Sequence, residues 1–277
     1  MDIAKATKKK VVPTIDPMRE EDVTDFEVSY SEELQEESAV PIIRFDSVSK
    51  AYSNGDPALE NINLSILPGE FVSLVGASGA GKSTLLKLIY SEEVPTTGTV
   101  LFNGRDLAAI KRKHLPYYRR NIGTVFQDFK LLPQKTAFEN IAYALEVYGK
   151  PTEEILDEVP QILEIVELEN KANNLPKQLS GGEQQRVAIA RALILQPKMI
   201  IADEPTGNLD PVSAEGIIDL LLEINQLGTT VILATHNQAL VNKVGRRVVA
   251  LDRGRIVSDV MEGQYVFTDR RRPAKTV

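Results

Sequence analysis

The sequence contains no cysteine. This absence excludes disulfide bonds, thiolate metal sites and cysteine nucleophiles together, and it suits a reducing cytoplasm. The sequence also lacks an uninterrupted apolar run near the roughly 20 residues that a membrane-spanning helix needs. Its first residues, MDIAKATKKKVV, lack the apolar stretch of a secretory signal. We therefore expect a protein that is made and kept in the cytosol.

Residues 41–277 carry almost no net charge. Of the net charge of -7, almost all lies in the first forty residues, which hold five Lys or Arg and eleven Asp or Glu. The rest is close to neutral, so nothing in its balance favours nucleic-acid binding. Residues 1–40 have few apolar anchors and pass from a basic cluster to an acidic run, which predicts a disordered acidic arm. Residues 263–277 end in RRRPAKTV and are expected to form a frayed basic tail.

The residues between these ends, 41–262, have the pattern of one α/β domain. The short runs IIRFDSVSKAY, NINLSI, FVSLVG and TVLFNG, separated by NGDP, PGE and NGRD turns, predict an antiparallel β region leading into a central sheet. Helical patterns follow over about 128–185, where Pro160 could kink or break the second helix. The buried runs KMIIAD, TTVILATH and RVVALDRG, with SAEGIIDLLLEINQLG between the first two, predict βαβ units and a parallel sheet.

A glycine-rich loop, GASGAGKS, follows the apolar strand FVSLV and precedes the helical TLLKLIY. It fits the G-x-x-x-x-G-K-[ST] pattern in the strand–loop–helix context that the pattern requires. Backbone amides of such a loop surround phosphates, while Lys82 can reach the β- and γ-phosphates and Ser83 can hold Mg²⁺. The predicted nucleotide-binding residues of this segment are Gly76, Ala77, Ser78, Gly79, Ala80, Gly81, Lys82, Ser83 and Thr84.

Two acids and a histidine end later strands. Asp203, at the end of an apolar strand, is placed to steady Mg²⁺, and Glu204 would orient the attacking water. Taken alone, such a pair is as often a solvated turn, but the upstream glycine loop favours catalysis. His236 ends TTVILATH and is one of two histidines. It could contact the γ-phosphate and the water of Glu204, whereas a lone histidine at a strand end is more often structural.

The segment LSGGEQQ, residues 179–185, precedes the helical RVAIARALILQ. Ser180, Gly181, Gly182 and Glu183 lie at a helix N-terminus, which offers a second anion site far along the chain from the first. This segment resembles the signature of the ATP-binding-cassette (ABC) proteins. The resemblance implies that the second site faces ATP held by another subunit, so that two copies enclose two nucleotides head to tail.

The resemblance to ABC proteins extends from Ile42 to about Val260. It implies a RecA-like parallel sheet with an antiparallel β subdomain and an α-helical subdomain, and an active ATPase that uses ATP and Mg²⁺. Tyr52 resembles the aromatic residue that stacks on adenine, although a strand tyrosine can instead pack on its neighbours. Gln127 resembles the glutamine that senses Mg²⁺ and the attacking water and that faces toward the membrane partner. The implied Mg²⁺-binding residues are therefore Ser83, Gln127 and Asp203. Asn208, Leu209 and Asp210 resemble the loop that crosses the dimer interface.

Two stretches, GASGAGKSTLLKLIYSEEVPTTGTV and RRNIGTVFQDFKLLPQKTAFENIAYALEV, resemble the FtsE family of cell-division ATPases. The resemblance implies a homodimer at the cytoplasmic face of the inner membrane. There it would work with an integral membrane protein resembling FtsX that regulates cell-wall hydrolysis. The alternatives are a true ABC transporter, such as a lipoprotein or macrolide exporter or an importer, and an ATP-gated scaffold. Chromosome-maintenance and translation cassettes are disfavoured because no coiled-coil insert or second cassette is present.

The acidic arm departs from the short chains of that family. It could be a solvated tail or a docking segment for division-ring proteins. Through Lys8, Lys9 and Lys10 it could instead contact anionic lipid.

Overall fold

The computed structural model describes residues 40–52 and 57–261. The predicted arm, except Val40, and the predicted basic tail lie outside the described residues. No helix in the described part is both long and apolar enough to cross a membrane.

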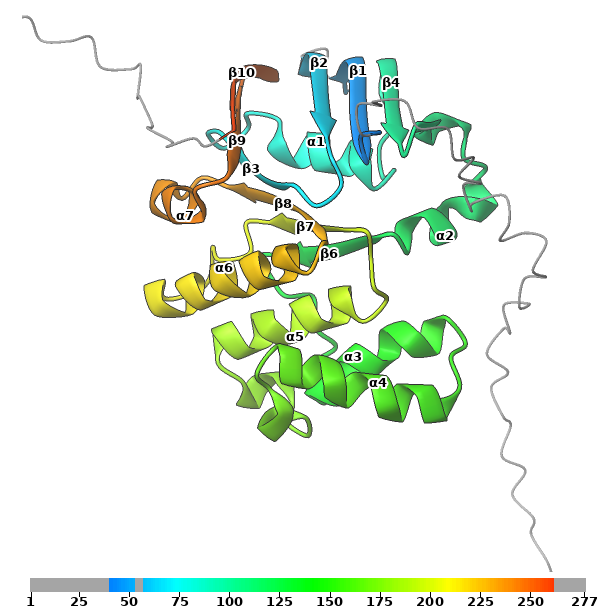
Figure 1. Ribbon diagram of the computed structural model, residues 1–277, viewed down its shortest axis with the longest axis vertical. Helices are drawn as coiled ribbons and strands as arrows, with labels where there is room; N and C mark the ends of the chain where they lie inside the picture. Colours follow the sequence, from blue (N-terminus) through cyan, green and yellow to red (C-terminus); the bar gives the residue numbers. More distant parts are fainter. Residues whose placement is uncertain (1–39, 53–56, 262–277) are drawn as a thin grey trace, which may run out of the picture. The chain divides into compact units, whose positions relative to one another are not determined.

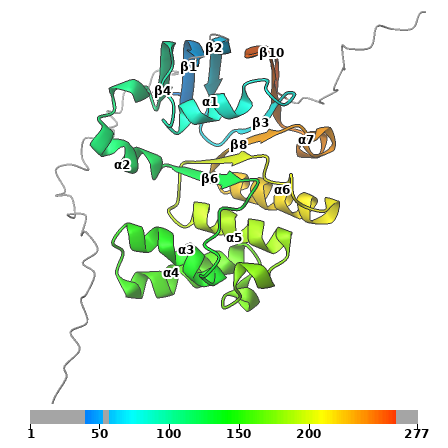
Figure 2. The same cartoon turned by 180° about the vertical axis from the view of Figure 1, so that it is seen from behind.

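A six-stranded sheet forms the centre, in the order β10-β9-β3-β8-β7-β6 (Figures 1 and 2). The strands are β3 (Phe71–Val75), β6 (Ile122–Phe126), β7 (Met199–Asp203), β8 (Thr230–Thr235), β9 (Arg247–Asp252) and β10 (Arg255–Val260). All neighbours pair in parallel except β9 and β10. The expected parallel sheet is therefore confirmed. Its most buried strands, β3, β8 and β7, lie in the interior of the sheet.

A second sheet is antiparallel, in the order β2-β1-β4-β5, as the turn-rich first part of the sequence predicts. Its strands are β1 (Ile43–Ala51), β2 (Pro57–Ile66), β4 (Thr97–Phe102) and β5 (Arg105–Asp106). In β1, Ile43 and Phe45 are buried while Arg44 between them is exposed, the alternation of a sheet with one covered face. This sheet and α1 (Lys82–Ile89) lie on one side of the central sheet in Figure 1.

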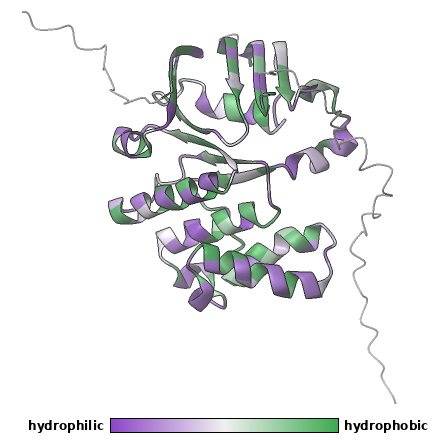
Figure 3. Ribbon diagram, viewed as in Figure 1, coloured by the Kyte–Doolittle hydropathy of each residue, from purple (hydrophilic) through white to green (hydrophobic). Residues whose placement is uncertain are grey.

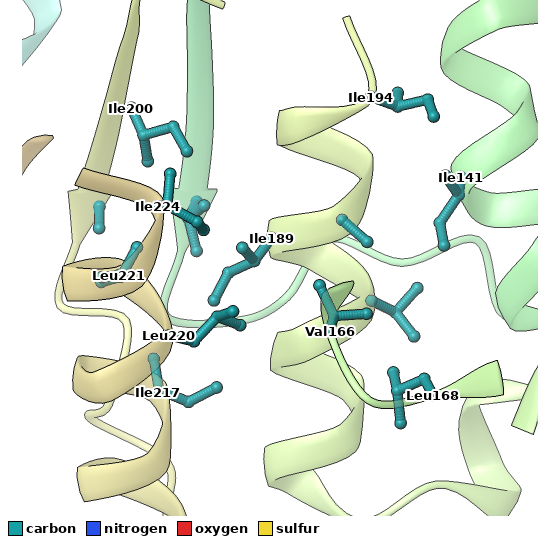
Figure 4. Close-up of a cluster of buried hydrophobic side chains, with 14 of the residues drawn as sticks. Ile141, Val166, Leu168, Ile189, Ile194, Ile200, Ile217, Leu220, Leu221 and Ile224 are labelled. Carbon is teal, nitrogen blue, oxygen red and sulfur yellow. The ribbon is translucent and has the colours of Figure 1, made fainter. Parts of the chain in front are cut away.

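The central sheet is covered on both faces because its strands place apolar residues on each. In β7, Met199 and Ile201 join the core shared with α1 and the antiparallel sheet, while Ile200 and Ala202 join the opposite core. Figure 4 shows this second core, where Ile200 lies near side chains of α6 (Pro211–Gln226) and α5 (Gly181–Leu193). Hydrophilic and hydrophobic residues alternate along α6 in Figure 3, as expected for a helix with one covered face.

Helices α3 (Ala137–Val147), α4 (Thr152–Ile165) and α5 form the helical part, and α5 contains most of the run RVAIARALILQ that the sequence predicts to be helical. Pro160 does not break α4. It lies on the exposed side, as does Leu156, whose carbonyl loses its helical partner and can be hydrated instead. The smaller helical elements are η2 (Leu107–Ala109), η3 (Arg112–His114), α2 (Leu115–Arg119), η4 (Glu169–Lys171), η5 (Pro176–Gln178) and α7 (Gln238–Val244).

Candidate functional site

The phosphate loop, residues 76–83, joins the end of β3 to the start of α1. Gly81 precedes the helix with φ 107°, and a Cβ there would lie 2.7 Å from the carbonyl oxygen of Ala58, so the position requires glycine. Lys82 is 7% exposed, and its ammonium donates to the carbonyls of Gly76 at 2.8 Å and Ala77 at 3.3 Å. The ammonium of Lys82 therefore spans the phosphate loop, in a position where it can bind a phosphate.

Ser83 and Asp203 contact each other although they are far apart in the sequence. The hydroxyl of Ser83 donates to Oδ2 of Asp203 at 3.0 Å. Burial raises the pKa of the Asp203 carboxyl, the hydrogen bond from Ser83 lowers it, and the neighbouring charge of Glu204 raises it further. A hydroxyl and a partly buried carboxylate at this distance form a hard oxygen donor pair beside the phosphate loop, which suits Mg²⁺.

Glu204 has a left-handed backbone, with φ 50°, that turns the chain away from β7. Its amide donates to the carbonyl of Ala234 in β8 at 2.8 Å. Its side chain lies 2.8 Å from Nδ1 of His236 and 3.8 Å from the Lys82 ammonium. The carboxylate therefore lies between the lysine of the phosphate loop and a histidine that is 68% exposed.

Gln127, just after β6, is joined to Asn208 by two reciprocal hydrogen bonds. Its side-chain amide donates to Oδ1 of Asn208 at 3.0 Å, and the Asn208 amide donates back to the carbonyl of Gln127 at 3.0 Å. Gly207 permits this approach, because a Cβ there would lie 2.7 Å from Nε2 of Gln127. The loop after β6 and the loop after β7 are thus fastened together.

These groups surround one cavity of about 370 Å³. Lining it are Ala58, Ser78, Gly79, Gly81, Lys82, Ser83, Thr84, Gln127, Asp203, Glu204 and His236. Phosphate-loop amides, a lysine, two acids, a glutamine and a histidine thus share one space, as the sequence predicts. Gly76, Ala77 and Ala80 belong to the same loop but are not among the lining residues.

Other predicted site residues lie outside this cavity. Tyr52 is 39% exposed, and the ammonium of Lys50 lies 5.1 Å from the centre of its ring. Asp210 begins α6 by accepting hydrogen bonds from the amides of Val212 and Ser213, both at 3.0 Å. The pKa of its carboxyl is lowered first by a side-chain hydrogen bond from Ser213 and then by these amides. The roles predicted for Tyr52 and Asp210 remain predictions.

The 180–183 turn, residues Ser180 to Glu183, also lies outside the cavity. Ser180 accepts from the Glu183 amide at 3.2 Å, and the Glu183 carboxylate accepts from the Ser180 amide at 2.7 Å, so α5 begins with a capping box. That backbone hydrogen bond is the main cause of a lowered pKa for Glu183. Within one copy this turn is not among the residues that line the phosphate-loop cavity, and its role toward another copy remains a prediction.

Three contributors to the site are not among the residues predicted from the sequence. Ala58 lines the cavity from β2, and only the fold brings it there. Gln185 is buried in α5, and its amide donates to the carbonyl of Phe126, next to Gln127, at 3.3 Å. Arg191 donates to the carbonyls of Phe129 at 2.9 Å and Lys130 at 2.6 Å. A charged residue within the apolar run of α5 was a signal that could have identified Arg191.

The chain is similar to known proteins over most of its length. Residues 59–207 match the family model described as ABC transporter. The cell division ATP-binding protein FtsE of Bacillus subtilis is 54% identical over 81% of this chain and 98% of its own length. FtsE of Mycobacterium tuberculosis is 51% identical over 81% of this chain and 98% of its own, and FtsE of Escherichia coli is 46% identical over 78% and 97%.

Solved structures give the same fold. The cassette MJ0796, described as a dimer in a post-hydrolysis state bound to ADP and Pi, has a TM-score of 0.72 and 39% identity, covering 80% of this chain and 100% of its own. CbiO1 of Clostridium perfringens, part of the ABC transporter complex cbiONQ, has a TM-score of 0.74 and 32% identity, covering 79% and 88%. The chain therefore belongs to the ABC transporter family, as an ATP-binding cassette ATPase of the group named cell division ATP-binding protein FtsE.

Proposed function

We propose that this chain is the ATP-hydrolysing subunit of a complex in which two copies close over two ATP molecules and act on a membrane protein resembling FtsX. The observation that carries the proposal is the single cavity shared by Lys82, Ser83, Asp203, Glu204 and His236. The FtsE relatives favour a role in cell division over substrate transport. The complex would lie at the cytoplasmic face of the membrane. Closure of the dimer would change the conformation of the membrane partner, which would in turn regulate cell-wall hydrolysis.

Each cavity residue has a task in this proposal. Lys82 releases its two loop carbonyls and binds the β- and γ-phosphates. Glu204 accepts a hydrogen bond from the attacking water and orients it, while His236 fixes the carboxylate and meets the γ-phosphate. Gln127 positions the water from the opposite loop.

Mg²⁺ would be held by Ser83 directly and by Asp203 through water, with Gln127 beside it. When bound, the ion neutralises the charge on the phosphate oxygens. The described residues contain no group of three or more His, Asp or Glu side chains suited to hold a metal ion. The remaining ligands would therefore come from the nucleotide, as Mg²⁺ commonly requires.

The change Asp203→Asn is expected to weaken Mg²⁺ binding, since a carboxylate beside the ion becomes a neutral amide. Loss of an outer-sphere partner typically costs about 10–100-fold in metal affinity. The measurement is the Mg²⁺ concentration that gives half-maximal ATP hydrolysis, with Asp219→Asn on α6 as control. An unchanged Mg²⁺ requirement in Asp203→Asn would contradict the assignment.

A second cavity, of about 440 Å³, offers a place for the membrane partner. This groove is lined by Ile122, Gly123, Thr124, Phe126, Lys130, Leu132, Tyr143, Arg191, Ala192 and Leu195. Its edge is the segment after Gln127, where Phe129 and Lys130 both have positive φ and are held by Arg191. In ABC proteins the corresponding region receives the coupling helix of the membrane subunit, so movement in the groove would reach Gln127.

Replacing Tyr143 with Glu is expected to abolish isolation of the membrane partner with this chain, because a charge is placed in a largely apolar groove. Tyr143 is 44% exposed on α3, so the fold should tolerate the change. Val147, one turn further along α3 and 51% exposed, does not line the groove, and Val147→Glu is the matched control.

The experiment isolates the tagged full-length chain from membranes and identifies the bound protein. A partner with four membrane spans and a large external loop would support signalling to wall hydrolases. A wide multi-helix channel would instead support transport. Equal loss of the partner in both variants, or retention in both, would contradict the assignment of the groove.

A further inference from the structure

A ridge of positive charge lies on the segment that precedes the groove strand β6, from the residue before η3 to the residue after α2. This basic ridge consists of Lys111, Arg112, Lys113, Arg119 and Arg120. The chain carries no acid between Asp106 and Asp128, so these five cations have no acidic neighbour in sequence. They form a local concentration of charge in a chain whose net charge is -7.

The side chains of Lys111, Arg112 and Lys113 are exposed. Within the described ranges they form no ion pair or side-chain hydrogen bond, in contrast to the exposed Lys150, Lys243 and Arg255, which contact carboxylates. No carboxylate of the described residues therefore neutralises their charge.

The ridge is firmly attached to the domain. Tyr118 is fully buried, donates its hydroxyl to the carbonyl of Ile89, and meets the ring of Phe102 edge-on at 5.1 Å. Arg119 donates to the carbonyls of Tyr90 at 3.1 Å and Ser91 at 3.0 Å, just beyond α1. The cations are thus carried on a rigid base, which lowers the entropy lost when they bind.

The ridge is also continuous with the groove. The Arg120 guanidinium lies 3.9 Å from the ring centre of Tyr148, at the end of α3, and 4.5 Å from that of Tyr117. Two residues later Ile122 begins β6 and lines the groove, as does Tyr143 on α3. The groove proposed to receive a membrane protein therefore lies next to a segment rich in cations.

From this placement we infer that the basic ridge binds the headgroups of anionic phospholipids at the membrane surface beside the partner. The inference rests on the proposed function, because it takes the groove as the side that meets a membrane protein. The ridge residues line neither of the two cavities, so the cations form an open surface. Such a surface suits the spread charge of a bilayer better than a single bound anion, and each Lys or Arg near a bilayer contributes about 1 kcal/mol.

The test is co-sedimentation of the full-length protein with phosphatidylcholine vesicles, with and without phosphatidylglycerol. The variant combines Lys111→Gln, Arg112→Gln and Lys113→Gln, and a matched variant combines Lys8→Gln, Lys9→Gln and Lys10→Gln, which removes the same charge elsewhere. Three cations at about 1 kcal/mol each predict a loss on the order of 100-fold in binding for the ridge variant.

We expect the wild type and the matched variant to bind phosphatidylglycerol vesicles, more weakly at high salt, and the ridge variant to lose that binding. Three results would overturn the inference: loss only in the matched variant, equal binding to vesicles without phosphatidylglycerol, or no vesicle binding at all. ATP hydrolysis in solution, measured on the same samples, should stay unchanged in both variants. A failure of the proposed ATPase role would appear there, separately from vesicle binding.

Discussion

The change Glu204→Gln is expected to reduce ATP hydrolysis by on the order of 10²- to 10⁴-fold while leaving ATP binding intact. The glutamine has nearly the same shape but cannot orient a water as a carboxylate acceptor. It also loses the charge that faces His236 at 2.8 Å and Lys82 at 3.8 Å. The phosphate loop is untouched, so nucleotide should still bind and two copies should remain closed over it.

The measurements are phosphate release and the elution volume of the protein with ATP and Mg²⁺. Glu146→Gln, an exposed position on α3 away from the cavity, is the matched control and should hydrolyse ATP at the wild-type rate. If Glu204→Gln also kept that rate, the assignment of Glu204 would be wrong. If Glu204→Gln bound ATP but never formed a dimer, even with the membrane partner, the proposal that two copies close over ATP would be wrong.

The change Ser180→Asp is expected to prevent that closure. Asp begins a helix about as well as Ser, so the capping of α5 and the stability of the fold should persist. The new carboxylate would, however, face the phosphates of ATP held by the other copy. A like charge opposed across an interface costs several kcal/mol, which is a loss of dimer affinity on the order of 100-fold or more.

The comparison that isolates the effect of charge is Ser180→Asn. Asparagine has nearly the same shape as aspartate and also begins helices well, but it carries no charge. Both changes are made in the Glu204→Gln protein, and dimer formation is followed at increasing ATP. The Asp variant should remain monomeric, while the Asn variant should be weakened far less. Equal dimerisation of both would show that the 180–183 turn does not meet phosphate.

Local patterns predict most of the fold and the half of the candidate site that is continuous in sequence. The phosphate loop lies where the spacing from Gly76 to Ser83 places it, between a strand and a helix. Asp203 ends β7 and His236 follows β8, and these buried strands are neighbours in a parallel sheet, so their convergence follows from topology. These features depend on short-range rules of periodicity and turn chemistry.

Other features depend on contacts that a single sequence does not express. The two hydrogen bonds between Gln127 and Asn208 join loops 81 positions apart. The edge strands β6 and β10 are mixed in character, because an edge has one neighbour and less burial to enforce a pattern. The groove is formed by side chains from several elements. The basic ridge suggests lipid binding only because it lies next to that groove.

The left-handed backbone of Glu204 sets the stability of the fold against the proposed role of its side chain. A residue with a Cβ held at φ 50° costs on the order of 1–3 kcal/mol, whereas glycine adopts that conformation freely. Glycine at position 204 would therefore relieve backbone strain, and the same exchange would remove the proposed water-orienting group. A variant made more heat-resistant by this exchange is expected to hydrolyse ATP more slowly.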